Sequence, residues 1–428
     1  MTQVALNYGR KKILLNLDPQ WDVTVIKKIE MPSLGDPSSD TRMALSQGIN
    51  AKSLSHEASE CKSACILICD ITRPVPNGLI LPPILRTLLS SGIKKENILI
   101  LIATGLHRPN EGMELEELVE DSWVLENFRI ENHFAEDETA HVDLGLTTKG
   151  TPVKLDRRFI DSDLKLVTGL VEPHFMAGFS GGRKVVAPGI AHKDTIKTFH
   201  NYRFMSDHSA KSCVLDHNPL HLEQLEIIKK IGRVLAVNTV IDEDRKLAFI
   251  NYGEIVESHL NAVNFVRKYI VKEVCKKFGT VVTSAAGYPL DQTYYQTVKG
   301  IVGPSDIIAE GGDVVVVSSC TEGLGSAHFA RAQDKMIKLG EKAFLTGLAK
   351  KKFADIDEWQ TQMQIKATSK FNVHLFTEGL NKKEKRLTGI NMIDSVEETI
   401  RDLMIKKDDK SLAIIPEGPY VVPKYVSP

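Results

Sequence analysis

The stretch CILICDITRPVPNGLILPPILRTLLSSGIKKENILILIATG, residues 65–105, decides the fold class of this chain. It begins and ends with short apolar runs, 65–70 and 97–105, that are rich in isoleucine and typical of buried strands. The amphipathic segment 78–92 between them, with its prolines near the start, predicts a helix. Two strands joined by a helix pair in parallel through a right-handed crossover. The stretch therefore predicts an α/β fold with a largely parallel sheet flanked by helices.

Similar apolar runs occur after this unit, and most of them end in a glycine or a polar loop residue. We expect each of them to be a further strand. They lie at 164–171, 232–242, 279–287, 312–323, 372–379 and 411–418. A helix is expected at 394–407, and a long amphipathic helix within 259–278 is expected to connect two domains.

A chain of 428 residues is too long for one ordinary core, because single cores stop growing at about 250 to 300 residues. We therefore expect two α/β domains, each with a largely parallel sheet flanked by helices. The expected N-terminal domain is 1–270 and the expected C-terminal domain is 271–407. The proline-containing tail, about 408–428, is expected to form an edge strand or to pack back onto the N-terminal domain.

The composition argues against several classes of partner. A hydrophobic fraction of 42%, a charged fraction of 25% and a formal net charge of -1 give no field that would attract nucleic acid or an anionic membrane. No apolar run approaches the length that spans a bilayer, and the first residues do not resemble a signal peptide. A cytoplasmic location is the simplest expectation. The six cysteines show neither a disulfide framework nor zinc or iron-sulfur spacing.

Three loops that follow predicted strands carry most of the candidate site residues. Ligands of open parallel sheets bind outside the carboxyl ends of the strands, so these loops are expected to contribute to one site. In chain order they carry Asp70, Thr72 and Arg73; Thr104, His107 and Arg108; and Glu172, His174, Ser180 and Lys184.

Each of these loops has a functional and a structural interpretation. The guanidinium of Arg73 suits a carboxylate or phosphate, although an ion pair with Asp70 is equally compatible with the sequence. His107 and His174 both follow strands and stand beside proline-containing turns. Histidine is the side chain whose ordinary pKa suits proton transfer near neutrality, which favours a catalytic role over simple packing.

The segment FSGGRK, 179–184, resembles a phosphate-binding turn. Its glycines would let the backbone approach an anion, although a glycine-rich surface turn is the common alternative. Lys184 is either a phosphate contact or, if desolvated, a nucleophilic amine. His200 follows at a distance, and one protein ligand makes a metal site only when an organic cofactor supplies the remaining donors.

The segment GYPLDQTYYQTVKG, 287–300, adds candidates from the second half of the chain. Gln296 and Lys299 are three residues apart, so in a helix they share one face. A solvated helix face is the alternative. Tyr294 and Tyr295 either line the same site or pack in the core, and Trp359 is interpreted as a core residue that borders it at most.

Together, these motifs resemble those of the nickel-pincer lactate racemase family, whose members racemise or epimerise 2-hydroxy acids. The resemblance covers most of the chain. It rests on DITRPVP, ATGLHRPN, EPHFMAGFSGGRK, PGIA, His200 and DQTYYQTVKG, which occur in the family's order with compatible spacing.

The resemblance implies an active site in a cleft between the two domains and a nickel-pincer nucleotide as cofactor, with no role for NAD. This cofactor is a pyridinium-3-thioamide-5-thiocarboxylate mononucleotide that carries nickel. By resemblance it is bound covalently to Lys184, its nickel is bound by His200, and the proteins that build it are transient partners. The other implied cofactor contacts are Thr104, Ser180, Gly181, Gly182 and Arg183.

The resemblance also implies a mechanism. His107 and His174 exchange the hydroxyl proton on opposite faces of the substrate, while the α-hydrogen moves as hydride and leaves a planar 2-keto acid. The implied substrate is lactate or a larger 2-hydroxy acid. The implied substrate-binding residues are Asp70, Arg73, Tyr295, Gln296 and Lys299, with Asp70 orienting either Arg73 or a histidine.

Two other functions are compatible with the residues alone. A nicotinamide-dependent hydroxyacid dehydrogenase is one, although no early strand is followed by the G-x-G-x-x-G fingerprint. A non-catalytic protein that binds a nucleotide-like anion through the Ser-Gly-Gly loop is the other.

Overall fold

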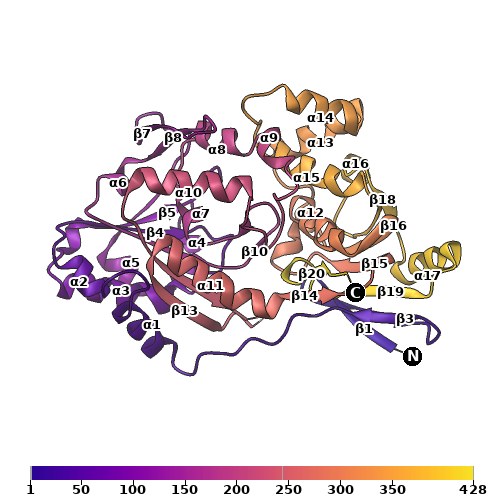
Figure 1. Cartoon of the computed structure of the whole chain (residues 1–428), viewed down its shortest axis with the longest axis horizontal. Helices are drawn as coiled ribbons and strands as arrows, with labels where there is room; N and C mark the ends of the chain where they lie inside the picture. Colours follow the sequence, from indigo (N-terminus) through magenta and orange to yellow (C-terminus); the bar gives the residue numbers. More distant parts are fainter. Residues whose placement is uncertain (1, 243, 428) are drawn as a thin grey trace. The chain divides into compact units, whose positions relative to one another are not determined.

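The computed structural model describes residues 2–242 and 244–427. The chain folds into two compact units, which are shown together in Figure 1. Unit 1 comprises Met1–Ile29, His200–Cys213 and Tyr269–Pro428. Unit 2 comprises Glu30–Phe199 and Val214–Lys268. Both units are therefore built from segments that are not continuous in sequence.

This division differs from the expected contiguous domains. The expected boundary near residue 270 does coincide with one crossing between the units, at Lys268 and Tyr269. However, residues 1–29 and 200–213 group with the C-terminal segment rather than with the N-terminal domain, and so does the tail after residue 407. Sheet pairing and hydrogen bonds between segments far apart in sequence explain the difference.

A six-stranded sheet forms the centre of unit 2, in the order β13-β12-β9-β4-β5-β6. All neighbours pair in parallel except β12 and β13, which are antiparallel. The fully apolar runs of β4 and β5 are buried because helices cover both faces of the sheet. The strands are β4 (Ala64–Cys69), β5 (Ile98–Ala103), β6 (Arg129–Asn132), β9 (Leu164–Leu170), β12 (Leu235–Ile241) and β13 (Leu247–Glu254).

The two faces of this sheet are covered by different helices. Ile66, Ile68 and Ile100 pack in one core with Leu81 and Leu85 of α3. The opposite face is contacted by α6 and α7. The helices of unit 2 are α1 (Pro37–Ser46), α2 (Leu54–Ala58), α3 (Asn77–Ser90), α4 (Met113–Val119), α5 (Ser122–Asn127), α6 (Arg157–Ile160), α7 (Arg183–Val186), α8 (Lys193–Phe199), α10 (Pro219–Ile231) and most of α11 (Ile255–Ile270).

Two small antiparallel hairpins complete unit 2. One pairs β7 (His141–Leu146) with β8 (Pro152–Asp156), and the other pairs β10 (Pro173–His174) with β11 (Gly178–Phe179).

Unit 1 also contains a six-stranded sheet, in the order β18-β17-β16-β15-β19-β3, and all of its neighbours pair in parallel. The two ends of the chain meet in this sheet, because β19 from the tail lies between β15 and the N-terminal strand β3. The tail strand is therefore an interior strand of unit 1. The strands are β3 (Asp22–Val25), β15 (Phe278–Ser284), β16 (Ile308–Val317), β17 (Asn372–Phe376), β18 (Asn391–Ile393) and β19 (Ser411–Ile415).

The antiparallel hairpin of β1 (Thr2–Tyr8) and β2 (Lys11–Leu17) packs on one face of this sheet. Its apolar side chains form one core with α17 and with strands β15 and β16. A further parallel pair joins β14 (Val271–Val274) to β20 (Val422–Tyr425). The helices of unit 1 are α9 (Tyr202–Met205), α12 (Tyr294–Val302), α13 (Ala327–Leu339), α14 (Glu341–Ala349), α15 (Glu358–Thr368), α16 (Lys382–Leu387) and α17 (Val396–Lys407).

The segment 200–213 belongs to unit 1 because hydrogen bonds of polar side chains hold it there. The amide of Asn201 donates to the carbonyl oxygen of Lys352 at 2.8 Å. The ammonium of Lys366 in α15 donates to the carbonyl oxygen of Asp207 at 2.8 Å. These contacts bind the segment that carries His200 to the helical part of unit 1.

The α/β fold, the predicted strands named above and the helices expected at 78–92 and 394–407 are confirmed. The helix expected within 259–278 ends at Ile270, because Val271–Val274 form strand β14 and pair with β20. Pro82 and Pro83 lie inside α3 rather than at its entry. No disulfide joins any of the six cysteines within the part of the chain that the structure describes. None of the described helices has the length and apolarity needed to cross a membrane.

Candidate active site

The three predicted loops of unit 2 meet at one edge of its sheet. Strands β9, β4 and β5 are neighbours and run in parallel, so their carboxyl ends lie side by side. Asp70 follows β4, Thr104 follows β5 and Glu172 follows β9. This is the edge at which open parallel sheets bind their ligands.

A buried carboxylate orients one of the predicted catalytic histidines. Nδ1 of His107 lies 2.5 Å from Oδ2 of Asp70. The side chain of His107 is 60% exposed, whereas that of Asp70 is 7% exposed. Thr72 donates to the other carboxylate oxygen through its hydroxyl, at 2.5 Å, and its backbone N–H, at 3.1 Å. Of the two partners considered for Asp70, the structure therefore pairs it with a histidine.

These contacts define the protonation state of the pair. Burial on its own would raise the pKa of Asp70, but the hydrogen bond and charge of His107, together with Thr72 and Arg73, outweigh burial and lower the pKa. An ionised Asp70 accepts the hydrogen on Nδ1 of His107, so the neutral ring keeps a lone pair on Nε2. The exposed ring can therefore accept a proton from a bound molecule.

Arg73 forms an ion pair with Glu172. Its Nε lies 3.5 Å from Oε1 of Glu172, and its Nη1 donates to the carbonyl oxygen of Thr72 at 3.0 Å. Arg73 and Glu172 come from neighbouring strand-end loops. The ion pair holds the guanidinium beside His107 and Asp70, where a carboxylate ligand would compete with Glu172.

The second predicted catalytic histidine differs from the first in what its Nδ1 contacts. His174 lies in the β10–β11 hairpin, and its Nδ1 accepts the backbone N–H groups of Met176, at 3.3 Å, and Ala177, at 3.2 Å. Because Nδ1 accepts these bonds, the hydrogen of the neutral ring is on Nε2. His107 and His174 thus differ in which ring nitrogen can accept a proton.

The Ser-Gly-Gly loop brings backbone close to the sheet edge. Gly181 and Gly182 have φ values of 75° and 50°. A Cβ at Gly181 would lie 2.9 Å from Cγ2 of Val171, and one at Gly182 would lie 2.9 Å from the ring of His259. Only glycine fits at these positions. Within the described residues, neither glycine N–H donates a hydrogen bond.

Lys184 directly follows this loop and is half-buried. Burial and, next to it, the positive charge of Arg73 lower the pKa of Lys184 to about 7. The ammonium makes no hydrogen bond or ion pair with any residue in the described ranges. A large fraction of this amine is therefore uncharged and nucleophilic at neutral pH.

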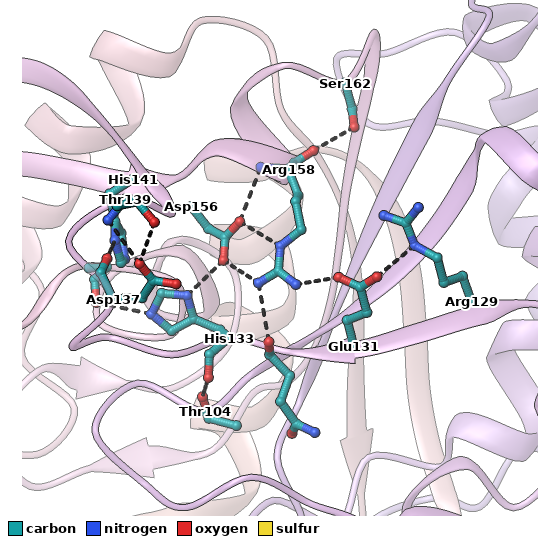
Figure 2. A network of polar contacts seen from close by, with 12 residues as sticks. Thr104, Arg129, Glu131, His133, Asp137, Thr139, His141, Asp156, Arg158 and Ser162 are labelled. Carbon is teal, nitrogen blue, oxygen red and sulfur yellow. Dashed lines mark hydrogen bonds and ion pairs between the residues drawn. The ribbon is translucent and has the colours of Figure 1, made fainter.

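Three residues expected to contact the cofactor instead use their side chains within the fold. The hydroxyl of Thr104 donates to the carbonyl oxygen of His133 at 2.6 Å (Figure 2). The hydroxyl of Ser180 donates to the carbonyl oxygen of Leu170 at 2.7 Å and accepts the N–H of Glu172 at 3.0 Å. Both hydroxyls fix the backbone of the loops that carry His107 and Lys184.

Arg183, the third of these residues, points into the protein interior. Its side chain is fully buried and donates to the carbonyl oxygens of Ala177, at 3.1 Å, and Phe179, at 3.3 Å. It contacts Nε2 of His259 at 3.1 Å. Burial lowers the pKa of Arg183 to about 9. The guanidinium therefore holds the β10–β11 hairpin against α11.

The predicted residues of the second half lie on α12 in unit 1. The helix starts after Thr293, whose hydroxyl accepts the N–H of Gln296 at 3.3 Å. Gln296 and Lys299 are both half-buried. Oε1 of Gln296 is buried and has no hydrogen-bond partner among the described residues. A buried amide oxygen without a partner is unfavourable and suits contact with a bound donor.

The ring of His200 contacts the aromatic side chain of Trp359 in unit 1. Its ring centroid is 4.9 Å from that of Trp359, and Nε1 of Trp359 donates to the hydroxyl of Tyr295 at 3.4 Å. Trp359 is buried, as expected for a core residue, and it also links the predicted metal ligand to a predicted substrate-binding residue. No sequence signal connects residues so far apart along the chain.

The structure places the candidates in two groups. Asp70, Arg73, His107, His174 and Lys184 lie in unit 2, whereas His200 and the α12 residues lie in unit 1. Among the described residues, no three His, Cys, Asp or Glu side chains gather in a way that could hold a metal ion.

Comparisons with known proteins identify the family. The model of the lactate racemase N-terminal domain matches residues 8–212, and that of the lactate racemase C-terminal domain matches residues 274–422. A lactate racemase of Lactiplantibacillus plantarum is 32% identical over 286 residues, 67% of each chain. The chain belongs to the lactate racemase family.

Other members of the family match nearly the whole chain. A lactate racemase of Thermoanaerobacterium thermosaccharolyticum is 29% identical over 433 residues and covers 99% of both chains. The structure of the lactate racemase apoprotein from that organism has a TM-score of 0.92 at 26% identity and covers 99% of this chain and 100% of that one. A Thermotoga maritima protein shares the fold, with a TM-score of 0.67, 22% identity and coverage of 92% and 99%. Racemases are isomerases, and this member of the lactate racemase family is an enzyme of that class.

Proposed function

We propose that this enzyme racemises or epimerises a 2-hydroxy acid, either lactate or a larger one, with a nickel-pincer nucleotide bound covalently to Lys184. The observation that carries the proposal is the environment of the Lys184 amine and its lowered pKa. Its amine has a pKa of about 7, no hydrogen-bond partner in the described residues, and a position next to two unpaired glycine N–H groups. These are the properties required of an amine that becomes acylated beside an anion.

The residues of this chain fit such a cofactor. Lys184 would hold it covalently, the N–H groups of Gly181 and Gly182 would bind its phosphate, and the ring of His200 would bind its nickel. When bound, the cofactor supplies the acceptor and donor for the α-hydride of the substrate. Transient contact with the proteins that build the cofactor belongs to the same proposal.

His107 accepts and returns the hydroxyl proton on one face of the substrate. Its Nε2 carries a lone pair in the neutral ring and accepts the proton as the hydroxy acid becomes a keto acid. Asp70 is 2.5 Å from Nδ1 and stabilises the imidazolium that results. The return of the same proton from Nε2 completes the reverse step.

His174 serves the other face. With its hydrogen on Nε2, the ring donates a hydrogen bond to the substrate oxygen. To accept a proton at Nε2 it must first carry its hydrogen on Nδ1, which requires Nδ1 to separate from the N–H groups of Met176 and Ala177. A small movement of the 175–177 turn is therefore part of the proposed cycle.

The remaining polar residues bind the substrate. Arg73 offers a planar pair of donors for the carboxylate, and Lys299 adds a second positive charge. The amide of Gln296, with its buried and unpaired Oε1, binds a hydroxyl or another donor. The hydroxyl of Tyr295 accepts a hydrogen bond from Nε1 of Trp359.

A direct test uses enzyme co-expressed with proteins that build the cofactor. Single enantiomers of lactate and of larger 2-hydroxy acids are incubated with it, and the appearance of the opposite enantiomer is followed by chiral chromatography. We expect both enantiomers of at least one acid to be converted by wild-type enzyme and neither by Lys184→Ala. Full activity of Lys184→Ala would refute the covalent role of Lys184.

A further inference from the structure

A buried carboxylate stands directly before the helix that carries the proposed substrate-binding residues of unit 1. Asp291 is fully buried and lies in the 3-10 turn Leu290–Gln292, just ahead of α12. Its Oδ2 accepts the backbone N–H of Gly9 at 2.7 Å and that of Ser319 at 3.0 Å.

The two donors come from distant parts of unit 1. Gly9 forms the turn between β1 and β2, and Ser319 follows the carboxyl end of β16. The backbone oxygen of Asp291 strengthens the second connection, because it accepts the N–H of Cys320 at 2.8 Å and the hydroxyl of Ser319 at 3.1 Å. Asp291 thus joins the N-terminal hairpin, the end of β16 and the start of α12.

Close backbone packing makes the connection to the hairpin specific. The N–H of Tyr288 donates to the carbonyl oxygen of Gly9 at 2.8 Å. Gly287 has a φ of 76°, and a Cβ there would lie 3.1 Å from both Cβ of Asn7 and the carbonyl oxygen of Gly9. The hairpin turn therefore lies against the backbone of the 287–291 loop with no space for a larger residue.

The start of α12 is also bonded to the loop after β16, which Asp291 holds through Ser319. The hydroxyl of Thr297 lies 2.7 Å from the hydroxyl of Ser318, and the N–H of Tyr294 donates to the carbonyl oxygen of Gly323. These bonds fix the helix to the loop that follows β16. A shift of Asp291 would consequently move the helix start and the side chains of Gln296 and Lys299.

We propose that Asp291 is a positioning residue for substrate binding. By bonding Gly9 and Ser319 it fixes the start of α12, and so holds Tyr295, Gln296 and Lys299 in the orientation that binds the hydroxy acid. The N-terminal hairpin thereby contributes to the active site without touching the substrate. This inference rests on the proposed function, since it assumes that the α12 side chains bind substrate.

Two substitutions distinguish this role from general stability. Asp291→Ala leaves two buried N–H groups without an acceptor, whereas Asp291→Asn keeps one oxygen to accept both of them. Asp313→Ala is the matched control. Asp313 is another buried acid of unit 1, in the interior of β16, where it binds His374 at 2.8 Å and Lys407 at 2.6 Å.

The measurements are hydrogen exchange of the cofactor-free protein over residues 287–300 and steady-state kinetics of the loaded enzyme. We expect Asp291→Ala to accelerate exchange in this segment and to raise KM for the hydroxy acid at least tenfold, with a smaller effect on kcat. Asp291→Asn should restore both values to within about threefold of wild type. Asp313→Ala should lower Tm without either local effect.

The inference is overturned if exchange over 287–300 is unchanged in Asp291→Ala, or rises equally in Asp313→Ala. It is also overturned if exchange rises locally while KM stays at the wild-type value. Failure of the proposed function gives a different result, because wild-type enzyme would then show no racemisation while the exchange experiment still reports whether Asp291 fixes α12.

Discussion

Nδ1 of His107 lies 2.5 Å from Oδ2 of Asp70, and the acid is buried while the ring is largely exposed. The acid thus favours the tautomer with the hydrogen on Nδ1, which leaves the lone pair of the neutral ring on Nε2. The pair joins the loops after β4 and β5, which are adjacent strands.

Substituting Asp70 should impair proton transfer more than substrate binding. In Asp70→Asn the neutral amide no longer favours a hydrogen on Nδ1 and no longer stabilises the imidazolium, so kcat should fall about 100-fold or more with a smaller change in KM. Thr72→Val is the control, because it removes one neutral donor to Asp70 and leaves its charge. A kcat loss of the same size in Thr72→Val would contradict a specific role of the carboxylate.

Lys184 should react with acylating reagents at a lower pH than other lysines. Its pKa of about 7 means that the uncharged amine is abundant at neutrality, whereas an ordinary lysine titrates near pH 10.4. Brief acetylation of the cofactor-free protein at a series of pH values, followed by peptide mass spectrometry, gives the midpoint for each lysine. We expect a midpoint near pH 7 for Lys184. A midpoint above pH 9 would show that burial does not activate this amine.

The tautomer of His174 can be observed directly. Because its Nδ1 accepts two backbone N–H groups, nitrogen NMR of the cofactor-free protein should show the hydrogen of the neutral ring on Nε2. His107 should show the hydrogen on Nδ1. His174→Ala and His107→Ala assign the two signals. Identical tautomers in both rings would contradict the asymmetry described above.

A cluster of three buried histidines should make unit 2 sensitive to acid. Figure 2 shows His133 and His141 of this cluster, and the ring of His141 lies edge-to-face with those of His133, at 5.2 Å, and His192, at 5.0 Å. Around them, His133 binds Asp156, which binds Arg158, and His192 faces Glu138 and Asp194.

Burial lowers the pKa of His141 and His192, and the charges of His133 and His192 lower that of His141 further. The unfolded chain then binds more protons than the folded one below about pH 6.5, so stability is present above that pH and is lost as the pH falls. Each pKa unit corresponds to about 1.4 kcal/mol. We expect Tm to fall between pH 7 and pH 5, and to fall less in His141→Gln. An equal fall in both proteins would exclude His141 as a cause.

Local sequence patterns predicted the interior strands of both sheets, because buried parallel strands are short, apolar and bounded by loops. The strands at the sheet edges, β6, β13, β3 and β18, were not predicted. The same patterns also predicted which loops meet at the sheet edge, since β9, β4 and β5 carry Glu172, Asp70 and Thr104 at equivalent ends. The sequence analysis did not predict the hairpin of β1 and β2. The glycine at position 9 does indicate a turn, because apolar residues stand before it, at Leu6 and Tyr8, and after it, at Ile13.

The remaining features depend on contacts between distant segments, which leave no local pattern. The pairing of β3 with β19 places both ends of the chain in one sheet and makes the domains discontinuous. The ion pair of Arg73 with Glu172 and the ring contact of His200 with Trp359 likewise arise only once the chain has folded. The sequence also could not predict that Arg183 points into the protein interior, because a basic residue after a glycine-rich turn is equally typical of an anion-binding site.

The most direct test of the central claim is the mass of the Lys184 peptide in enzyme purified from cells that build the cofactor. We predict that active enzyme carries one covalent adduct on Lys184 and about one nickel per chain, that nickel is lost from His200→Ala, and that the adduct is absent in Lys184→Ala. Unmodified Lys184 in enzyme that still interconverts the two enantiomers would contradict the account.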